Sequence, residues 1–286
     1  MTGSNIIQDI AVALDQDVVD ISPLGGGCIG QVYQATLQDG LRLVAKVDDS
    51  DNPHLDIEGY MLQFLSDHSE LPVPEVWHCT PRLLLMSFID GSSSFSKPTQ
   101  EHAAELLGCL HRVQGPAYGF EKDTLIGGLR QPNPWTDSWL TFFRDERLLY
   151  MGRECVRKGR FSREFYGRLR KFAGKLDLWL QEPRYPSLIH GDVWTSNVLA
   201  AGGKITGFLD PAIYFANPEI ELAFTTLFGT FGEWFFAAYQ EFNPLQPGFF
   251  EERRDIYNLY PLLVHARLFG GSYVNSLDNI LRRFDY

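Results

Sequence analysis

Three polar side chains near the middle of the chain have the types and the spacing that phosphoryl transfer requires. Asp192 and Asn197 lie five residues apart in the run His190-Gly-Asp-Val-Trp-Thr-Ser-Asn197, and Asp210 follows thirteen residues later. In phosphoryl transfer one aspartate orients and deprotonates the attacking hydroxyl, while a downstream asparagine and a second aspartate hold Mg²⁺. Mg²⁺ prefers hard oxygen ligands, so an amide and a carboxylate suffice beside nucleotide phosphates. The spacing therefore predicts Asp192 as the base and Asn197 and Asp210 as metal ligands, although a polar loop without chemistry is an equal alternative for this match alone.

A glycine-rich stretch near the N-terminus fits a loop that covers nucleotide phosphates. The run Leu24–Tyr33 matches the pattern Gly-x-Gly-x-x-Gly-x-Val. Glycine lets a backbone approach phosphates and adopt positive φ, but three consecutive glycines are also typical of a plain turn. A thiol in such a loop gains thiolate character, so Cys28 is a candidate redox switch, with a small residue chosen for packing as the alternative. The candidate nucleotide-binding residues of this loop are Gly25, Gly26, Gly27, Cys28, Gly30 and Val32.

A lysine and a glutamate further along the chain complete the predicted phosphate site. Lys46 lies in the apolar strand pattern Leu43-Val-Ala-Lys-Val47, which follows a turn at Asp39-Gly40. A glycine hairpin followed by a lysine on a strand is the order found in kinase N-lobes, where the lysine contacts the α- and β-phosphates. Glu58, in a helix predicted over residues 56–66, is the candidate ion-pair partner. A solvated glutamate favoured by the helix dipole is the alternative for Glu58.

The boundary between two composition zones predicts where adenine would bind. Strand patterns run over residues 75–79 and 82–89, and the second ends at Asp90-Gly91 and a serine-rich linker. We expect this point to be a hinge between an N-terminal lobe of residues 1–90 and a C-terminal lobe of residues 91–286. The backbone of Ser87, Phe88 and Ile89 would contact the adenine, and Met86 would line the back of its pocket.

The pattern after residue 97 is mainly helical, so we predict an α+β, bilobal, protein-kinase-like fold. A hairpin with a turn at Gly202-Gly203 is predicted over residues 198–209 and places Asp210 at its end. His111 is expected to be a packed, hydrogen-bonded core residue. Helices are predicted over residues 5–16, 99–113, 135–149 with Thr136 as N-cap, and 162–181.

Composition narrows the class of protein. The chain has 286 residues, 44% of them hydrophobic, and a net charge of −11. This charge argues against a nucleic acid or an anionic membrane as partner, because both require a cationic surface. No signal segment and no apolar run of membrane-spanning length is present, so we expect a cytoplasmic protein. We also expect a monomer or a weak homodimer. The cysteines, expected to be reduced, are Cys28, Cys79, Cys109 and Cys155.

Departures from the protein-kinase pattern indicate the kind of acceptor. Pro211-Ala212 replaces the Phe-Gly that follows the metal-binding aspartate in protein kinases. Only residues 211–218 separate Asp210 from Glu219, where Asn217-Pro218 predicts the start of a helix. Because this segment is too short for an activation segment, the chain lacks a platform for an extended peptide. We therefore expect a small polar substrate or a modified side chain that protrudes from a protein.

Several motifs spread over nearly the whole chain resemble the fructosamine (ketosamine) kinase family, within the wider group of aminoglycoside phosphotransferase and choline kinase-like enzymes. The wider group shares His190-Gly-Asp192 and the downstream Asp210, whereas Trp194 separates this chain from aminoglycoside kinases. The narrower resemblance rests on Gly25-Gly-Gly-Cys-Ile29, Ile126-Gly-Gly-Leu-Arg-Gln-Pro-Asn133, Trp135-Thr-Asp-Ser-Trp139, His190–Asn197, Asp210-Pro-Ala212 and Tyr260-Pro-Leu-Leu-Val-His-Ala-Arg-Leu-Phe-Gly-Gly271.

The resemblance implies phosphorylation of the 3-hydroxyl of a ketosamine with ATP and Mg²⁺, in a deglycation type of repair. The ketosamine would be a small molecule or protein-bound, with fructosamine and ribulosamine adducts both open. Trp194 and His190 are the candidate substrate contacts, and Trp194 would either stack on the sugar or its amine or brace the loop. The alternatives are a kinase of the same fold for an aminoglycoside, choline or a sugar, and a nucleotide-binding protein without catalysis.

Overall fold

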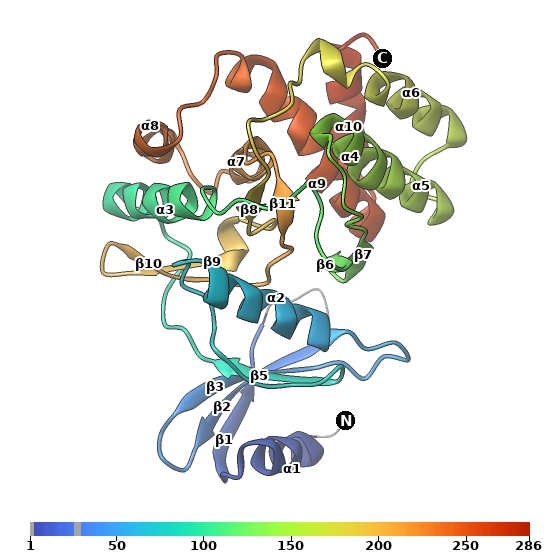
Figure 1. Cartoon of the computed structure of the whole chain (residues 1–286). Helices are drawn as coiled ribbons and strands as arrows, with labels where there is room; N and C mark the ends of the chain where they lie inside the picture. Colours follow the sequence, from blue (N-terminus) through green and yellow to red (C-terminus); the bar gives the residue numbers. More distant parts are fainter. Residues whose placement is uncertain (1–2, 26–29) are drawn as a thin grey trace.

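The computed structural model describes residues 3–25 and 30–286 and shows two lobes (Figure 1). The N-terminal lobe contains an antiparallel sheet with the strand order β1-β2-β3-β5-β4. This lobe also carries two helices, one at the outer end of the sheet and one between the lobes. Its elements are α1 (Gly3–Leu14), β1 (Val18–Pro23), β2 (Gln31–Leu37), β3 (Arg42–Val47), α2 (Leu55–His68), β4 (Val76–Cys79) and β5 (Leu83–Ser87).

Helix α2 is held by both lobes. Met61 and Leu65 belong to the core of the C-terminal lobe, whereas Leu55 and Leu62 pack with residues of β5. Residues four or seven positions apart lie on the same side of a helix, so each pair shares one face and the two faces contact different lobes. The Tyr60 hydroxyl also donates a hydrogen bond to Glu121 of the C-terminal lobe. The helix that carries Glu58 is therefore fixed relative to both lobes.

The C-terminal lobe is mainly helical and contains three small two-stranded sheets, β6-β7, β8-β11 and β9-β10. Its chain order interleaves short strands with α-helices, π-helical turns and 3₁₀ turns. The elements are α3 (Lys97–Leu110), β6 (Thr124–Ile126), β7 (Leu129–Gln131), α4 (Trp139–Phe142), the π-helical η1 (Phe143–Leu149), α5 (Tyr150–Arg157), α6 (Arg163–Ala173), η2 (Leu176–Leu178), β8 (Ser187–Ile189), η3 (Thr195–Asn197), β9 (Val198–Ala201), β10 (Lys204–Phe208), β11 (Tyr214–Ala216), α7 (Glu219–Leu227), α8 (Glu233–Phe242), the π-helical η4 (Phe249–Arg253), α9 (Arg254–Phe269) and α10 (Ser272–Arg283).

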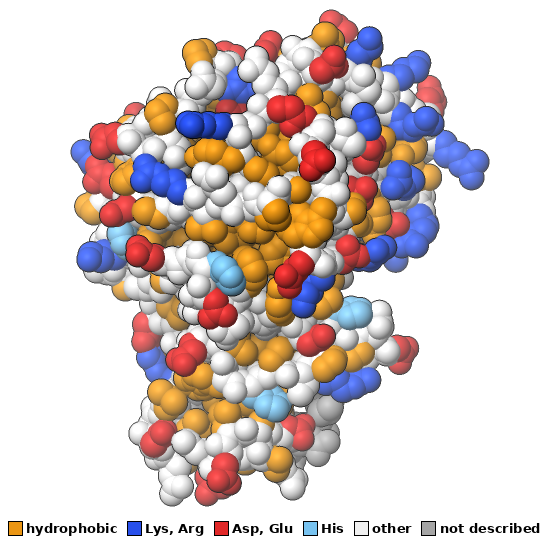
Figure 2. Space-filling view, in the orientation of Figure 1, with side chains coloured by type: hydrophobic (Ala, Val, Ile, Leu, Met, Phe, Trp, Pro, Cys, Tyr) orange, Lys and Arg blue, Asp and Glu red, His pale blue; other side chains and the backbone are white. Residues whose placement is uncertain are grey.

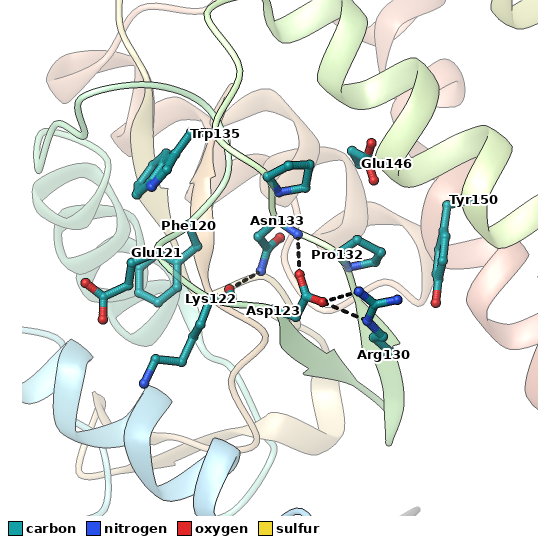
Figure 3. Close-up of a pocket in the computed structure, with 11 residues that line it drawn as sticks. Phe120, Glu121, Lys122, Asp123, Arg130, Pro132, Asn133, Trp135, Glu146 and Tyr150 are labelled. Atoms are coloured by element: carbon teal, nitrogen blue, oxygen red, sulfur yellow. Dashed lines mark hydrogen bonds and ion pairs between the residues drawn. The ribbon is translucent and has the colours of Figure 1, made fainter.

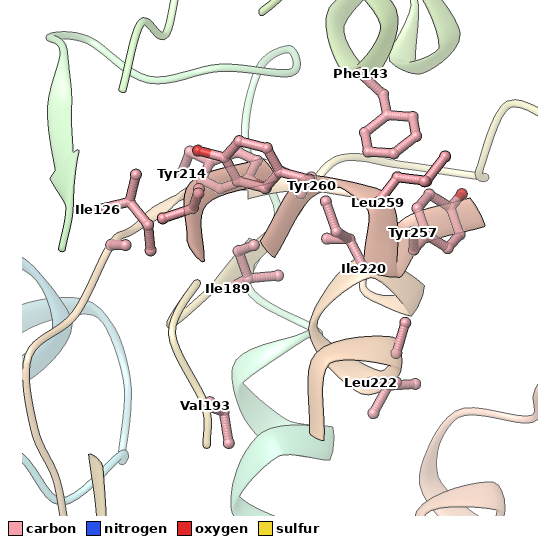
Figure 4. Packing of buried hydrophobic residues seen from close by; sticks show 14 of the residues in the cluster. Ile126, Phe143, Ile189, Val193, Tyr214, Ile220, Leu222, Tyr257, Leu259 and Tyr260 are labelled. Atoms are coloured by element: carbon pink, nitrogen blue, oxygen red, sulfur yellow. The ribbon is translucent and has the colours of Figure 1, made fainter. Parts of the chain in front are cut away.

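Two residues that flank Asp192 in the sequence belong to the core of this lobe (Figure 4). Ile189 at the end of β8 pairs with Tyr214 of β11, and both side chains are buried. Val193 is also fully buried within the same cluster, together with Ile220 of α7. Burying each such side chain contributes about 1.5–3 kcal/mol, so the two residues that bracket Asp192 anchor its loop in the core.

Most predicted elements are confirmed, but two helix boundaries were wrong. The helix predicted from Trp135 with Thr136 as N-cap begins at Trp139, and Ser138 is its cap, accepting a bond from the Thr141 N–H. Thr136 is excluded because its backbone pairs with Tyr118 in both directions. The helix predicted over residues 162–181 ends at Ala173, and only the short 3₁₀ turn Leu176–Leu178 follows within the predicted range.

The surface carries both signs of charge (Figure 2). Basic side chains gather over α5 and α6, on the right of the upper lobe in this view. The exposed ones are Arg153, Arg157, Lys158, Arg163, Arg170, Lys171 and the nearby Lys175.

Two expectations from the sequence stay predictions. One is the exclusion of nucleic acid as a partner, which rested on the overall charge. The other is the lobe boundary at residue 90. Among the residues that the structure describes, no helix is long and apolar enough to cross a membrane.

Candidate active site

Hairpin pairing brings Asn197 and Asp210 together. Val198, the first residue of β9, pairs with Phe208, the last residue of β10. Asn197 directly precedes β9 and Asp210 follows β10 by two residues, so the closed hairpin places both at the same end. A hydrogen bond of 2.8 Å from the Leu209 N–H to the Asn197 carbonyl extends this pairing by one step. The hairpin predicted from the sequence is thus the element that assembles the two candidate metal ligands.

A second strand pair places Asp192 beside them. β8 and β11 pair, and the Ala212 N–H donates to the His190 carbonyl at 2.8 Å. Gly191 adopts φ +86°, and a Cβ at this position would lie 2.1 Å from the Ala212 carbonyl oxygen. Only glycine permits this approach of the loop to the segment after Asp210. Gly191 is therefore required by the backbone geometry, and Asp192 beside it is required by the predicted chemistry.

Asp192 lies against Asn197 in a partly buried position. The Asn197 Nδ2 donates to the Asp192 Oδ2 at 2.8 Å and to its carbonyl at 3.1 Å. Burial, followed by the negative charge of Asp210, raises the pKa of Asp192 to about 8. The two carboxylates are thus close enough to repel each other, which is an environment that favours a cation between or beside them.

Lys46 connects the two lobes through ion pairs. Its Nζ lies 2.6 Å from the Glu58 Oε1 and 2.5 Å from the Asp210 Oδ1. Burial opposes the charged form, but the charges of Asp210 and Glu58 outweigh it and raise the pKa of Lys46. The expected pairing of Lys46 with Glu58 is present. Asp210 adopts φ +52°, a backbone conformation that non-glycine residues rarely take and that is enriched at functional sites.

The donor set around Asp210 fits Mg²⁺ that is bound together with nucleotide phosphates. It does not fit a metal held by protein side chains alone. In the described part of the chain, no group of three or more His, Cys, Asp or Glu side chains could hold a metal ion. Asn197 uses its amide nitrogen for Asp192, which leaves its Oδ1 for another partner. One carboxylate and one amide oxygen are what Mg²⁺ takes from a protein when phosphates and waters supply the remaining ligands.

Of the glycine-rich stretch between β1 and β2, the structure describes Leu24, Gly25 and Gly30. Leu24 N–H donates to the Val32 carbonyl at 2.8 Å, and Val32 pairs with Lys46 across the sheet. A Cβ on Gly30 would lie 2.3 Å from the Val47 carbonyl oxygen, and φ is +69°, so this glycine is needed for the hairpin itself. Gly25 is exposed with open space around it. Gly26, Gly27 and Cys28, with the proposed redox role of Cys28, lie outside the described residues.

The segment expected to contact adenine follows β5, and sheet pairing limits what it can offer. The Ser87 N–H donates to the Glu75 carbonyl at 2.9 Å, and the Phe88 N–H donates to the Arg42 carbonyl at 3.3 Å. These two N–H groups are therefore unavailable to a ligand, which corrects part of the prediction. The Ile89 N–H has no backbone partner within the described chain. Met86 is buried in the N-lobe core, where it pairs with Val44 and Val76.

The buried side chain of Glu221, which the sequence analysis missed, anchors the loop of residues 190–197. This loop carries Asp192 and Asn197 and is called the catalytic loop below. The Glu221 Oε1 accepts a hydrogen bond from the Gly191 N–H at 2.6 Å, and its Oε2 lies 2.8 Å from the His111 Nε2. His111 in turn has its Nδ1 2.7 Å from the Tyr239 hydroxyl. Burial would raise the pKa of Glu221, but the hydrogen bond and charge of His111 outweigh it and lower that pKa. The expected core role of His111 is confirmed.

The His190 side chain is buried in the C-terminal lobe. It is 0% exposed, its ring packs against Phe208, and its Nδ1 accepts a bond of 3.3 Å from the Asp192 N–H. This burial contradicts the prediction that His190 contacts substrate, because the ring lies under the loop rather than on it. Trp194, in contrast, is half-buried and packs against Phe228 and His265.

The motif at residues 126–133, which the sequence alone could not interpret, braces the segment after Asp210. Gln131 of β7 donates to the Ala212 carbonyl at 3.0 Å and accepts from the Tyr260 hydroxyl at 2.7 Å. Thr124 of β6 donates to the Ile213 carbonyl at 3.3 Å. These bonds fix the short segment that replaces the Phe-Gly switch of protein kinases.

A cavity of about 440 Å³ is lined by residues of β7 and of the segments around it (Figure 3). Phe120 and Trp135 line one end, and Tyr150 and Arg130 line the other. Asp123 between them is neutralised by an ion pair with Arg130. None of the residues predicted for the active site lines this cavity.

Fold and site together define a phosphotransferase of the protein-kinase-like class. Macrolide 2′-phosphotransferase from Brachybacterium faecium has a similar fold, with a TM-score of 0.61 at 16% identity over 97% of this chain and 96% of that one. A much closer structural match, a candidate fructosamine-3-kinase from Thermobifida fusca, has a TM-score of 0.86 at 27% identity, with 97% of both chains covered.

Sequence comparison identifies the family to which the chain belongs within this class. A family model described as fructosamine kinase matches residues 3–284, and the chain belongs to this family. A "probable ketoamine kinase" of Vibrio parahaemolyticus is 32% identical over 88% of both chains. One from Synechocystis is 37% identical, over 62% of this chain and 59% of that protein. A chloroplastic protein-ribulosamine 3-kinase of Oryza sativa subsp. japonica is 29% identical over 92% of this chain and 78% of that protein. The chain is therefore an ATP-dependent kinase.

Proposed function

We propose that this kinase transfers the γ-phosphoryl group of ATP to the 3-hydroxyl of a ketosamine, the sugar adduct of a glycated amine. The observation that carries the proposal is the convergence of Asp192, Asn197, Asp210 and Lys46 from separate segments on one point between the lobes. The family and the names of the relatives, ketoamine kinase and protein-ribulosamine 3-kinase, supply the acceptor class.

Each polar group at this point has a distinct role in the proposal. Lys46, oriented by Glu58, binds phosphate oxygens, and the glycine loop covers them. Asn197 and Asp210 would hold Mg²⁺, which would neutralise charge on the transferred group. Asp192 orients the sugar hydroxyl and accepts its proton as the oxygen bonds to phosphorus and the bond to ADP breaks. Most of the rate enhancement then comes from positioning and charge neutralisation rather than from covalent catalysis.

The short segment between Asp210 and α7 favours a small acceptor or a protruding side chain. Strand β11 begins at Tyr214, four residues after Asp210, and α7 begins at Glu219. The chain therefore builds no extended platform in front of the site. A ketosamine on a protein lysine protrudes far enough to enter without one, so both free and protein-bound adducts are within the proposal.

The test is ADP formation by the purified protein with Mg²⁺ and a panel of acceptors. The panel contains fructosyl-lysine, ribulosyl-lysine, glycated protein, aminoglycosides, choline and free sugars, and ³¹P NMR locates the phosphate on any product. We expect turnover on ketosamines, phosphate on the 3-oxygen, and loss of both without Mg²⁺. Turnover confined to an aminoglycoside, choline or a free sugar would overturn the acceptor, and ATP binding without turnover on any acceptor would overturn catalysis.

A further inference from the structure

The charges of the chain are separated between its two lobes. Residues 1–90 carry 14 acidic and three basic side chains, a charge of −11, which equals the net charge of the whole protein. Residues 91–286 carry 22 side chains of each sign, but residues 153–175 within them have nine basic and only two acidic ones. The net charge of the protein therefore does not describe the surface around α5 and α6. It gives no ground for excluding a polyanion from that surface.

Most of these basic side chains are exposed and gather on one side of the C-terminal lobe (Figure 2). They come from α5, α6 and the turns after them, and the two helices pack against each other. We call the seven exposed Lys and Arg side chains of residues 153–175 the basic face. Within the described chain the Arg157 side chain pairs with Glu154, and the other six side chains make no hydrogen bond or ion pair. Their charges are therefore available to a partner.

Stabilisation of the two helices does not account for this charge. Cations are favourable at the C-terminal end of a helix, where Arg170 and Lys171 lie, but unfavourable at its N-terminal end. Arg163 is the first residue of α6. Arg153 lies inside α5 and Lys175 lies beyond α6, so neither is in the last turn of a helix. The basic face thus carries more positive charge than its helices require.

The composition of the basic face favours one class of polyanion. Protein interfaces have an apolar core, and stable membrane binding needs an apolar or lipid anchor besides basic side chains. Within residues 150–185, all of which the structure describes, Leu178 is the one exposed large apolar side chain. Nucleic acid can be bound by charge alone, because each cation at a phosphate releases condensed counterions. Four of the seven side chains are arginines, whose guanidinium group matches phosphate bidentately.

We propose that the basic face binds the phosphate backbone of a nucleic acid without reading its sequence. This inference goes beyond the proposed function and does not depend on the acceptor. Helices α5 and α6 pack on η1, α9 and α10, and none of the candidate site residues lies in α5 or α6. ATP and nucleic acid should therefore bind at the same time. Contacts from most of the six unpaired cations predict a slope of about −4 to −5 for the logarithm of affinity against that of salt concentration.

Fluorescence anisotropy of the full chain with a labelled DNA duplex of about 20 base pairs, at roughly 50 to 200 mM KCl, measures this slope. We expect the affinity to fall roughly 200- to 1000-fold over that range. A duplex of scrambled sequence should bind equally well, because phosphates carry no sequence information. Saturating ATP, at constant Mg²⁺ and ionic strength, should leave the affinity unchanged.

A double variant of the basic face and a matched control locate the binding. Arg163→Gln with Lys175→Gln removes two charges, and neither residue stabilises a helix C-terminus, so the helices should be retained. This variant should bind the duplex roughly 100-fold more weakly at about 50 mM salt, with a slope less steep by about 2. Lys97→Gln with Lys204→Gln is the control, because both side chains are exposed on α3 and β10, across the lobe from α5 and α6 (Figure 1). It should change the affinity by less than about threefold, and both variants should keep wild-type ATP affinity.

Five results would overturn the proposal. The first two are no duplex binding by the wild-type chain at about 50 mM salt, and an unchanged slope in the basic-face variant. An equal loss in the control variant would assign the binding to overall charge. Competition by ATP would place the nucleic acid in the nucleotide site. Tighter binding to poly-glutamate or to phosphatidylserine-rich vesicles than to the duplex would make the partner an acidic protein or a membrane.

Discussion

Replacing Glu221 with glutamine tests whether a buried carboxylate positions the catalytic loop. Glu221 touches neither of the candidate metal ligands, but it accepts the Gly191 N–H at 2.6 Å, one residue before Asp192. Its second oxygen lies 2.8 Å from the His111 Nε2. The Glu221→Gln substitution keeps the size of the side chain and removes its charge, so any effect reports on these two hydrogen bonds.

The expected magnitude follows from the partners. Removing the charge weakens each of the two bonds by about 1 kcal/mol. The new amide group also places N–H donors opposite the His111 Nε2, and one buried unpaired donor costs about 1–3 kcal/mol. The free energy of unfolding should therefore fall by roughly 3–5 kcal/mol. A displacement of Asp192 by about 1 Å would lower kcat about 100-fold, with a smaller change in the KM for ATP.

Urea unfolding and steady-state ADP release measure the two effects separately, and the chain offers a matched control. Glu219 lies in the same helix and forms a two-bond ion pair with Arg253, with both distances 2.7 Å. Glu219→Gln should cost stability without changing kcat, because this pair does not contact the catalytic loop. Wild-type kcat in Glu221→Gln would refute the positioning role, and an equal fall of kcat in Glu219→Gln would assign the effect to general destabilisation.

Three further predictions concern the site. Asp192→Asn should lower kcat by orders of magnitude while nucleotide affinity, measured by calorimetry, stays close to wild type; normal turnover would remove Asp192 from the mechanism. Asp210→Asn should abolish the Mg²⁺ dependence of nucleotide binding, and an unchanged Mg²⁺ titration would contradict the ligand assignment. Burial lowers the pKa of His190 from 6.5 to about 4, so between these values the unfolded chain binds a proton that the folded chain does not. Stability should therefore fall as pH drops from about 6.5 toward 4, by up to about 3 kcal/mol, and less steeply in His190→Asn; parallel curves would contradict this.

The polar groups of the site were predictable because local sequence patterns fix their backbone. Strand, turn and strand at residues 198–208 place Asn197 beside Asp210 whatever the rest of the chain does. Lys46 on its strand follows from the same kind of local signal. Glu58 was harder to assign, because its partner is decided by the packing of α2 against both lobes, and sequence spacing gives only the face of the helix.

The missed residue Glu221 has a different sequence signal. It stands between the buried residues Ile220 and Leu222 of a helix. Such a residue is buried by its neighbours and needs a partner, which is a signal that a sequence can provide. The partner itself cannot be predicted, because Glu221 and Gly191 meet only through tertiary packing. His190 shows the reverse error, because it was predicted to contact substrate but its side chain is buried and packs against Phe208.

The brace from β6 and β7 explains why this kinase can lack the switch segment of protein kinases. In those enzymes the residues after the metal-binding aspartate change conformation, whereas here Gln131 and Thr124 hold the Ala212 and Ile213 carbonyls. Gln131 is itself fixed by Tyr260, in another of the motifs that mark the family. A buried amide with bonds on both sides has one low-energy position, so the segment that carries Asp210 is restricted to one conformation.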